Sequence, residues 1–113
     1  MAYSREDVAW AGGLFEGEGS FSFQSRSDRK AHYALARLSM SDEDVVRRFA
    51  DVVGFGSVNG PYQYRPDRKP MFVWTVQGLE RVQAFGAAVW PWLGTRRRTR
   101  LAEILRGHGE RTS

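Results

Sequence analysis

The sequence predicts an α+β fold in which helices pack on one face of an antiparallel sheet. Stretches with apolar residues at every second position occur as two pairs, and stretches with helical spacing precede, separate and follow these pairs. No internal repeat or linker divides the 113 residues. We therefore expect the order αββαββα(α), with a single domain over residues 1–107 and a polar C-terminal tail over 108–113.

The first helix is expected from about residue 4 to residue 19. Ser4 is a candidate N-cap, and Asp7 lies three residues later, in the position of a capping box. The apolar residues that follow recur at helical spacing: Val8, Ala11, Leu14 and Phe15.

The second half of this helix departs from ordinary helix composition. Gly12 and Gly13 each cost roughly 1 kcal/mol relative to alanine, and Glu16 and Glu18 lie at the negative end of the helix dipole. Adjacent small residues permit another backbone to come close, and carboxylates are stabilised there if a divalent cation lies among them. The alternative is a frayed, glycine-rich helix end with two solvated glutamates.

Apolar spacing also predicts the remaining elements. Strands are expected at 20–26, 31–40, 55–64 and 70–76, and helices at 41–53, 78–89 and 95–106. Asn59-Gly60-Pro61 predicts a turn or bulge within the third strand. The residues that alternation assigns to one side of a strand are Phe21 and Phe23, then Ala34, Ala36 and Leu38, and finally Phe72, Trp74 and Val76.

Charge and composition narrow the class of protein. The chain has 17 Lys and Arg against 13 Asp and Glu, a net charge of +4 that permits a nucleic-acid partner without requiring one. It contains no cysteine, which excludes disulfides and a thiolate zinc site. No signal peptide and no apolar run of about 20 residues is present, so we expect a cytoplasmic protein without a membrane partner.

The polar side of the first strand is informative as well. Ser22, Gln24 and Arg26 share this side, and both Gln and Arg can make bidentate contacts with base edges in the major groove. A solvated sheet face would have the same composition, so the strand alone leaves both interpretations open.

Residues 11–19, AGGLFEGEG, resemble the LAGLIDADG motif of homing endonucleases. Gly13, Leu14 and Gly19 match the motif, and the predicted order of elements matches a single-motif member over nearly the whole chain. The resemblance implies a homodimer whose two motif helices meet at a two-fold axis. It implies site-specific cleavage of long, pseudo-palindromic double-stranded DNA, with no small-molecule substrate.

The same resemblance implies roles for individual residues. Glu18 matches the last acid of the motif, which makes it the expected catalytic residue and ligand of Mg²⁺ or another divalent cation, whereas Glu16 matches an acid with a lesser, structural role. The residues expected at the dimer interface are Ala9, Gly12, Gly13 and Glu16.

Two further positions test the resemblance. Residues 91–97, PWLGTRR, resemble the family pattern Pro-x-Leu-x-x-Lys-Arg and place Arg96 where a basic residue supports catalysis, although a phosphate-binding or solvated basic patch explains Arg96 equally well. Met40 occupies a position where the family often has a polar residue. Because a thioether cannot donate a hydrogen bond, either Ser39 or Ser41 substitutes for it, or cleavage is weak or lost.

The resemblance also implies that the sheet face reads DNA. The expected DNA-binding residues are Ser22, Gln24, Arg26, Tyr33, Arg37, Arg65, Arg68, Lys69 and Arg97. The sequence is also compatible with two alternatives: a related protein that binds DNA or assists intron splicing without cleaving, and an unrelated α+β binding domain.

Overall fold

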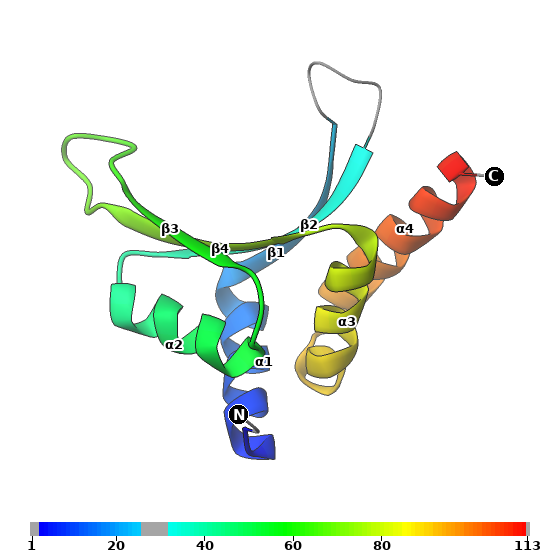
Figure 1. Ribbon diagram of the computed structural model, residues 1–113, viewed down its shortest axis with the longest axis horizontal. Coiled ribbons are helices and arrows are strands. Elements are labelled where there is room, and N and C mark those ends of the chain that lie inside the picture. Colours follow the sequence, from blue (N-terminus) through cyan, green and yellow to red (C-terminus); the bar gives the residue numbers. More distant parts are fainter. Residues whose placement is uncertain (1–2, 26–31, 113) are drawn as a thin grey trace.

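The computed structural model describes residues 3–25 and 32–112, and it confirms the predicted fold class and order of elements (Figure 1). The strands are β1 (Gly19–Ser25), β2 (His32–Met40), β3 (Ser57–Tyr62) and β4 (Met71–Gln77). The helices are α1 (Arg5–Glu18), α2 (Glu43–Val53), α3 (Leu79–Val89), the short 3₁₀ helix η1 (Trp90–Trp92) and α4 (Thr95–Thr112).

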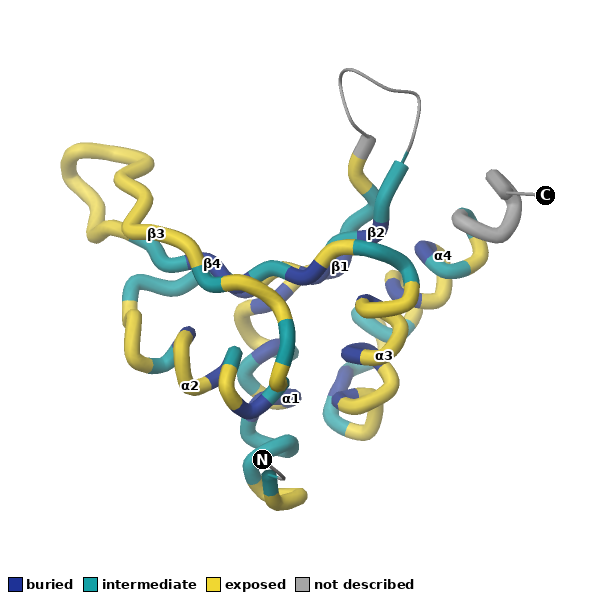
Figure 2. Tube along the Cα trace, in the orientation of Figure 1, coloured by how far each residue is buried: buried dark blue, intermediate teal, exposed yellow. Residues whose placement is uncertain are grey.

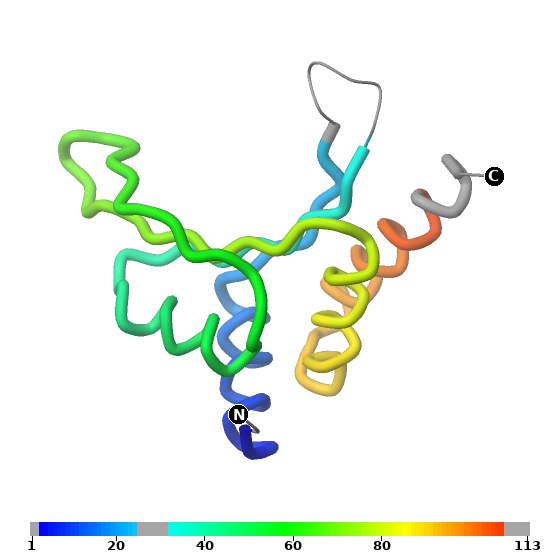
Figure 3. Tube along the Cα trace, in the orientation of Figure 1, coloured from blue at the N-terminus to red at the C-terminus, as the bar shows by residue number. Residues whose placement is uncertain are grey.

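Helix α1 begins with the predicted capping box. The Ser4 hydroxyl accepts a hydrogen bond from the Asp7 amide at 3.1 Å, and the Asp7 carboxylate accepts one from the Ser4 amide at 3.3 Å. The helix lies between α2 and α3, and it buries Ala11 and Phe15 against them and the sheet (Figure 3). Strand β1 follows α1 without a loop, so the end of this helix leads directly into the sheet.

The four strands form one antiparallel sheet in the order β1-β2-β4-β3. Strands β2 and β4 are therefore central, and each has a neighbour on both sides. The registers place Arg37 of β2 between Ser20 of β1 and Thr75 of β4, and Ser57 of β3 opposite Thr75. Ser20, Arg37 and Thr75 alternate with buried residues along their strands, and Ser57 precedes Val58, which is partly buried against the core, so the four positions share one face of the sheet.

Aromatic residues fill the core between the helices and the other face. Ring centroids of Phe15 and Phe85 lie 4.8 Å apart, those of Phe49 and Trp74 lie 4.9 Å apart, and all four residues are buried. The Trp74 indole N–H donates to the Phe55 carbonyl at 3.1 Å, so the one polar atom of this side chain is satisfied. Burial of Trp74 and Val76 confirms two of the three predicted inward residues of β4, and Phe72 is partly buried against the same core. In β2 the structure decides which side faces the core: Ala34, Ala36 and Leu38 are buried.

No described helix covers the second face of the sheet. Figure 1 shows this face curving upward toward the segment between β3 and β4, and Figure 2 shows that segment as exposed throughout. The sheet thus presents a curved, accessible surface while its helices lie on the opposite side.

Three details differ from expectation. Helix α4 continues past Arg106 to Thr112, because a glycine such as Gly107 lowers helix propensity without forbidding the helix. Phe23 is only partly buried. Strand β3 is shorter than predicted, and the predicted irregularity at 59–61 is a shift of register between Asn59 and Tyr62. Glycine is needed there, because Gly60 has φ +132° and a Cβ would lie 2.7 Å from the Met71 carbonyl oxygen.

Candidate functional site

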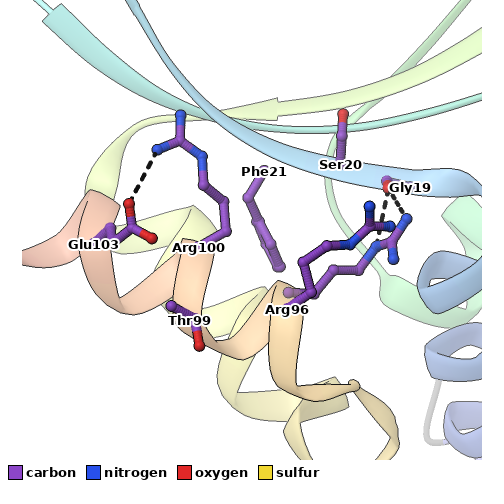
Figure 4. Close-up of a pocket in the computed structure, with 8 residues that line it drawn as sticks. Gly19, Ser20, Phe21, Arg96, Thr99, Arg100 and Glu103 are labelled. Atoms are coloured by element: carbon purple, nitrogen blue, oxygen red, sulfur yellow. Dashed lines mark hydrogen bonds and ion pairs between the residues drawn. The ribbon is translucent and has the colours of Figure 1, made fainter.

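An open cavity of about 480 Å³ lies where β1 meets the first turns of α4 (Figure 4). Its lining is rich in arginine and consists of Gly19, Ser20, Phe21, Arg96, Arg97, Thr99, Arg100 and Glu103. The end of α1 and the start of α4 are distant in sequence, and the cavity brings them together. The contacts beside it divide the predicted site residues into two groups.

Glu16 is held by residues of its own chain. One carboxylate oxygen accepts a hydrogen bond from the Gly94 amide at 2.6 Å, and the other pairs with an Arg97 guanidinium nitrogen at 3.1 Å. Gly94 immediately precedes α4, so Glu16 places a negative charge at the positive end of that helix. These contacts agree with the structural role expected of Glu16 and occupy both of its oxygens.

Arg97 takes part in the same hydrogen-bond network. Its Nε and Nη2 donate to the Gly19 carbonyl oxygen at 3.1 and 2.7 Å, while Nη1 faces Glu16, and only 13% of the side chain is exposed. The dashed lines at Gly19 in Figure 4 mark the two bonds to the carbonyl. The structure therefore gives Arg97 an internal role that the sequence did not predict, and its contact with DNA stays a prediction.

Glu18 and Arg96 form the second group. Both are exposed, and within residues 3–25 and 32–112 neither takes part in a hydrogen bond or an ion pair. Arg96 lines the cavity next to Gly19, the residue that follows Glu18. A carboxylate and a guanidinium thus remain available to a ligand at the same end of α1.

The residues predicted at the dimer interface lie on different sides of α1. Gly12 is buried, and a Cβ there would lie 2.9 Å from the Trp92 Cβ of the same chain. Glu16 is engaged as described above. Ala9 is half-buried, and Gly13 is exposed, so that a Cβ added to it would meet no described atom within 4 Å; Gly17, one helical turn later, shares both properties of Gly13. The free side of the helix therefore carries Gly13 and Gly17.

Four of the predicted DNA-binding residues lie on the uncovered face of the sheet, and three lie in the loop beside it. Ser22 and Gln24 of β1 and Arg37 of β2 lie on the uncovered face, as does Tyr33, which pairs with Gln24. Arg65, Arg68 and Lys69 lie in the exposed segment between β3 and β4. Arg26 lies outside the described residues.

The end of β2 supplies no polar group at position 40. Met40 is partly buried and packs against the hydrophobic core, with Ser39 and Ser41 half-buried on either side. The structure therefore gives Met40 a packing role. Whether a neighbouring serine replaces the polar residue usual in the family stays a prediction.

Sequence patterns predicted neither the Glu16–Arg97 pair nor the hydrogen bond between Arg37 and Tyr64. The Glu16–Arg97 pair joins residues 81 positions apart, and no spacing pattern links them. Tyr64, which accepts a hydrogen bond from Arg37 at 3.1 Å, could have been suspected because it is an aromatic residue in a basic loop.

Within the described residues, no group of three or more His, Cys, Asp or Glu side chains is arranged to hold a metal ion. The Glu18 carboxylate suits a hard divalent cation chemically, since such cations prefer carboxylate oxygens. Among the described residues of one chain, however, Glu18 is the one carboxylate at this end of α1 without a hydrogen bond or an ion pair. In the same part of the chain, no helix is both long and apolar enough to cross a membrane.

Comparisons with known proteins identify the fold. No protein-family model and no curated protein matches the sequence. The homing endonuclease I-CvuI in complex with DNA superposes with a TM-score of 0.70 at 19% identity, covering 91% of this chain and 68% of that one. The LAGLIDADG meganuclease I-AabMI bound to uncleaved DNA also gives 0.70, at 13% identity, covering 90% of this chain and 35% of that one.

A group I intron-encoded homing endonuclease, I-CeuI, complexed with DNA, gives a TM-score of 0.66 at 14% identity, covering 92% of this chain and 54% of that one. This chain thus spans from about a third to two thirds of the length of these structures. Together with the four-stranded antiparallel sheet and its helices, the likeness shows that the chain has the fold of LAGLIDADG homing endonucleases.

Proposed function

We propose that the protein is a site-specific, metal-dependent endonuclease that acts as a homodimer on double-stranded DNA. The proposal depends on a contrast at the end of α1. Glu16 and Arg97 are bonded to each other, whereas Glu18 and Arg96 are exposed and, among the described residues, have no hydrogen bond or ion pair. A fold shared with proteins whose structures were solved with DNA supports the choice of substrate.

Two copies would meet through the free side of α1. Gly13 and Gly17 leave open space on this side, which lets a second helix approach closely. Such an arrangement would bring together two copies of Glu18, one from each chain, and would supply the carboxylates that a single chain lacks. Ala9, half-buried four residues before Gly13, would lie beside this contact.

Glu18 from each copy would then hold a divalent cation beside the DNA backbone. Bound Mg²⁺ supplies charge stabilisation and lowers the pKa of coordinated water. The protein itself would orient the DNA through the uncovered sheet face and would neutralise phosphate charge through Arg96. Arg97 and Glu16 would hold the ends of the two helices that carry these groups.

The experiment is a nicking assay on a plasmid that carries the sequence flanking the gene. We expect strand cleavage with Mg²⁺ and none with EDTA, and we expect Glu18→Gln to abolish cleavage while it leaves DNA binding intact. Glu80→Gln is a matched control, because Glu80 is an exposed glutamate of α3 that does not line the cavity. Cleavage by Glu18→Gln at the rate of the unaltered protein would refute the proposal.

A second candidate function follows from Met40. Its side chain packs against the core and offers no hydrogen-bonding group at the end of β2, which favours a related protein that binds DNA, or assists intron splicing, without cutting. Metal-independent binding of the same duplex, with no nicking under any divalent cation, would support this second function instead.

A further inference from the structure

A groove of about 310 Å³ lies on the uncovered face of the sheet. Its lining residues are Leu35, Arg37, Asn59, Tyr62, Tyr64, Val73, Thr75 and Gln77. Arg37 is the one charged side chain among them, and the others are apolar, hydroxyl or amide side chains. Within the described residues Arg37 has no acidic partner. Its positive charge is therefore uncompensated at the centre of an accessible surface.

Tyr64 orients this charge without neutralising it. Arg37 Nη2 donates to the Tyr64 hydroxyl at 3.1 Å, across 27 residues of sequence, and 59% of Tyr64 is exposed. Since a guanidinium has five N–H donors in a planar fork, one bond to a neutral hydroxyl restricts the fork and leaves the other donors for a ligand. The contact reduces the rotamer entropy that binding would otherwise cost.

The position of Arg37 distinguishes a base from a phosphate as its ligand. Arg37 lies on β2, a central strand, with β1 on one side and β4 on the other. A sheet that enters the major groove presents its central side chains to base edges, whereas phosphates border the groove and meet the rim of the protein surface. Arg65, Arg68 and Lys69 occupy that rim, in the loop between β3 and β4.

We propose that Arg37, held by Tyr64, reads a guanine in each half of the DNA site. The inference rests on the proposed function and adds to it the identity of one base. Bidentate hydrogen bonds from an arginine fork match the O6 and N7 acceptors of guanine, and no other base offers two acceptors there. Leu35, a half-buried apolar residue that lines the same groove, would meet the methyl group of a neighbouring thymine.

The strand register predicts where a second preference lies. Gln24 pairs with Tyr33, which is four residues from Arg37 along β2. At about 3.3 Å per residue this separation is about 13 Å, or about four base pairs at about 3.4 Å each. A glutamine side chain binds adenine preferentially, through two hydrogen bonds to N6 and N7 of the adenine. The guanine and the adenine would therefore be about four base pairs apart, with the guanine nearer the end of α1.

The test is selection of duplexes from a randomised library in EDTA, so that binding is measured without cleavage. The full chain should enrich guanine at two symmetry-related positions. Arg37→Lys keeps the charge but lacks the planar guanidinium. Its preference for guanine over the other bases should fall at least about fivefold, while its total affinity for DNA stays nearly unchanged. Tyr64→Phe should lose part of this preference.

Arg47→Ala is the matched control for charge. Arg47 is an exposed arginine of α2, on the helical side of the sheet, and it pairs only with Glu43 among the described residues. Its loss should leave the selected sequence unchanged.

Other outcomes would overturn the inference. If Arg37→Ala lowers affinity equally for all sequences, Arg37 contacts phosphate and the inference is wrong. If Arg37→Lys enriches the same guanine as strongly as the unaltered protein does, another residue contacts that guanine and the inference is wrong. Failure of the unaltered protein to bind any duplex would instead refute the proposed function itself.

Discussion

Arg97 donates two hydrogen bonds to the Gly19 carbonyl oxygen, at 2.7 and 3.1 Å, and thereby ties the start of α4 to the end of α1. A third bond, to Glu16, closes the network at 3.1 Å. Arg96 precedes Arg97 and Glu18 precedes Gly19, so the same contacts set the relative position of the two residues that we propose to act on DNA. The internal ion pair of Glu16 and Arg97 thus fixes the positions of the neighbouring exposed residues Glu18 and Arg96.

Removing Arg97 should therefore destabilise the fold. In Arg97→Gln the Glu16 carboxylate loses its cationic partner and the Gly19 carbonyl loses two donors, and hydrogen bonds to charged groups contribute about 1.5–3 kcal/mol. We expect the free energy of unfolding, measured by urea denaturation, to fall by about that amount. Arg96→Gln is the same change one residue earlier, at an exposed side chain without a hydrogen bond or an ion pair among the described residues, and it should stay within about 0.5 kcal/mol of the unaltered protein. Equal losses in both variants would contradict the division of roles.

Arg96 should instead affect cleavage. If its guanidinium stabilises charge that develops on the phosphate, Arg96→Gln should slow single-turnover cleavage by about a hundredfold or more, while Kd for the duplex changes only a few-fold. Arg96→Lys, which retains the charge, should recover part of the rate. A Kd that rises in proportion to the loss of rate would assign Arg96 to plain phosphate binding, the alternative that the sequence left open.

Local pattern was sufficient to predict most of the fold. The capping box at Ser4, the end of α2 at Val53 and the alternation that puts Ala34, Ala36 and Leu38 on one side of β2 all depend on residues near each other in the chain. Each is a preference that tertiary packing reinforces, so the structure keeps it. The irregularity of β3 was predicted for the same reason, since Asn59-Gly60-Pro61 is a local signal.

Local sequence pattern could not predict which residues of the site bond to each other and which remain exposed. Glu16 and Glu18 are two residues apart and Arg96 and Arg97 are adjacent, so composition alone gives no reason to separate them. Only the resemblance to the motif distinguished Glu16 from Glu18, and it implied no internal role for Arg97. The distinction arises because Glu16 faces Gly94 and Arg97 across the junction of α1 and α4, and Glu18 does not. Likewise, Gly12 and Gly13 are identical residues, but only Gly12 lies against Trp92.

This difference between adjacent glycines gives a test of the proposed homodimer. Gly13→Leu places a large side chain in open space, so the single chain should remain folded, but two copies of α1 could no longer approach closely. We expect the protein to change from dimer to monomer by size-exclusion chromatography with light scattering, with Gly17→Leu behaving in the same way. If both variants remain dimeric, the free side of α1 is not the interface.

Gly12→Ala provides the opposite control. Its Cβ would lie 2.9 Å from the Trp92 Cβ, closer than van der Waals contact, so η1 or α1 must shift. Overpacking of this kind costs typically about 1–3 kcal/mol, which should lower the urea midpoint without a specific loss of dimer. A Gly12→Ala variant as stable as the unaltered protein would show that the Trp92 contact is looser than the structure indicates.

The loop between β3 and β4 should determine how strongly DNA binding depends on salt. The Gln63 side chain donates to the carbonyl oxygens of Arg65 and Arg68, which orders the loop while the basic side chains remain exposed at the rim. If Arg68 contacts a phosphate, Arg68→Ala should weaken binding uniformly across sequences and reduce the slope of log K against log salt by about 0.9. Arg47→Ala should leave that slope unchanged, because Arg47 lies on the helical side of the sheet. A slope that Arg68→Ala leaves unchanged would place the loop away from the DNA backbone, whereas a change of base preference in this variant would assign Arg68 to readout.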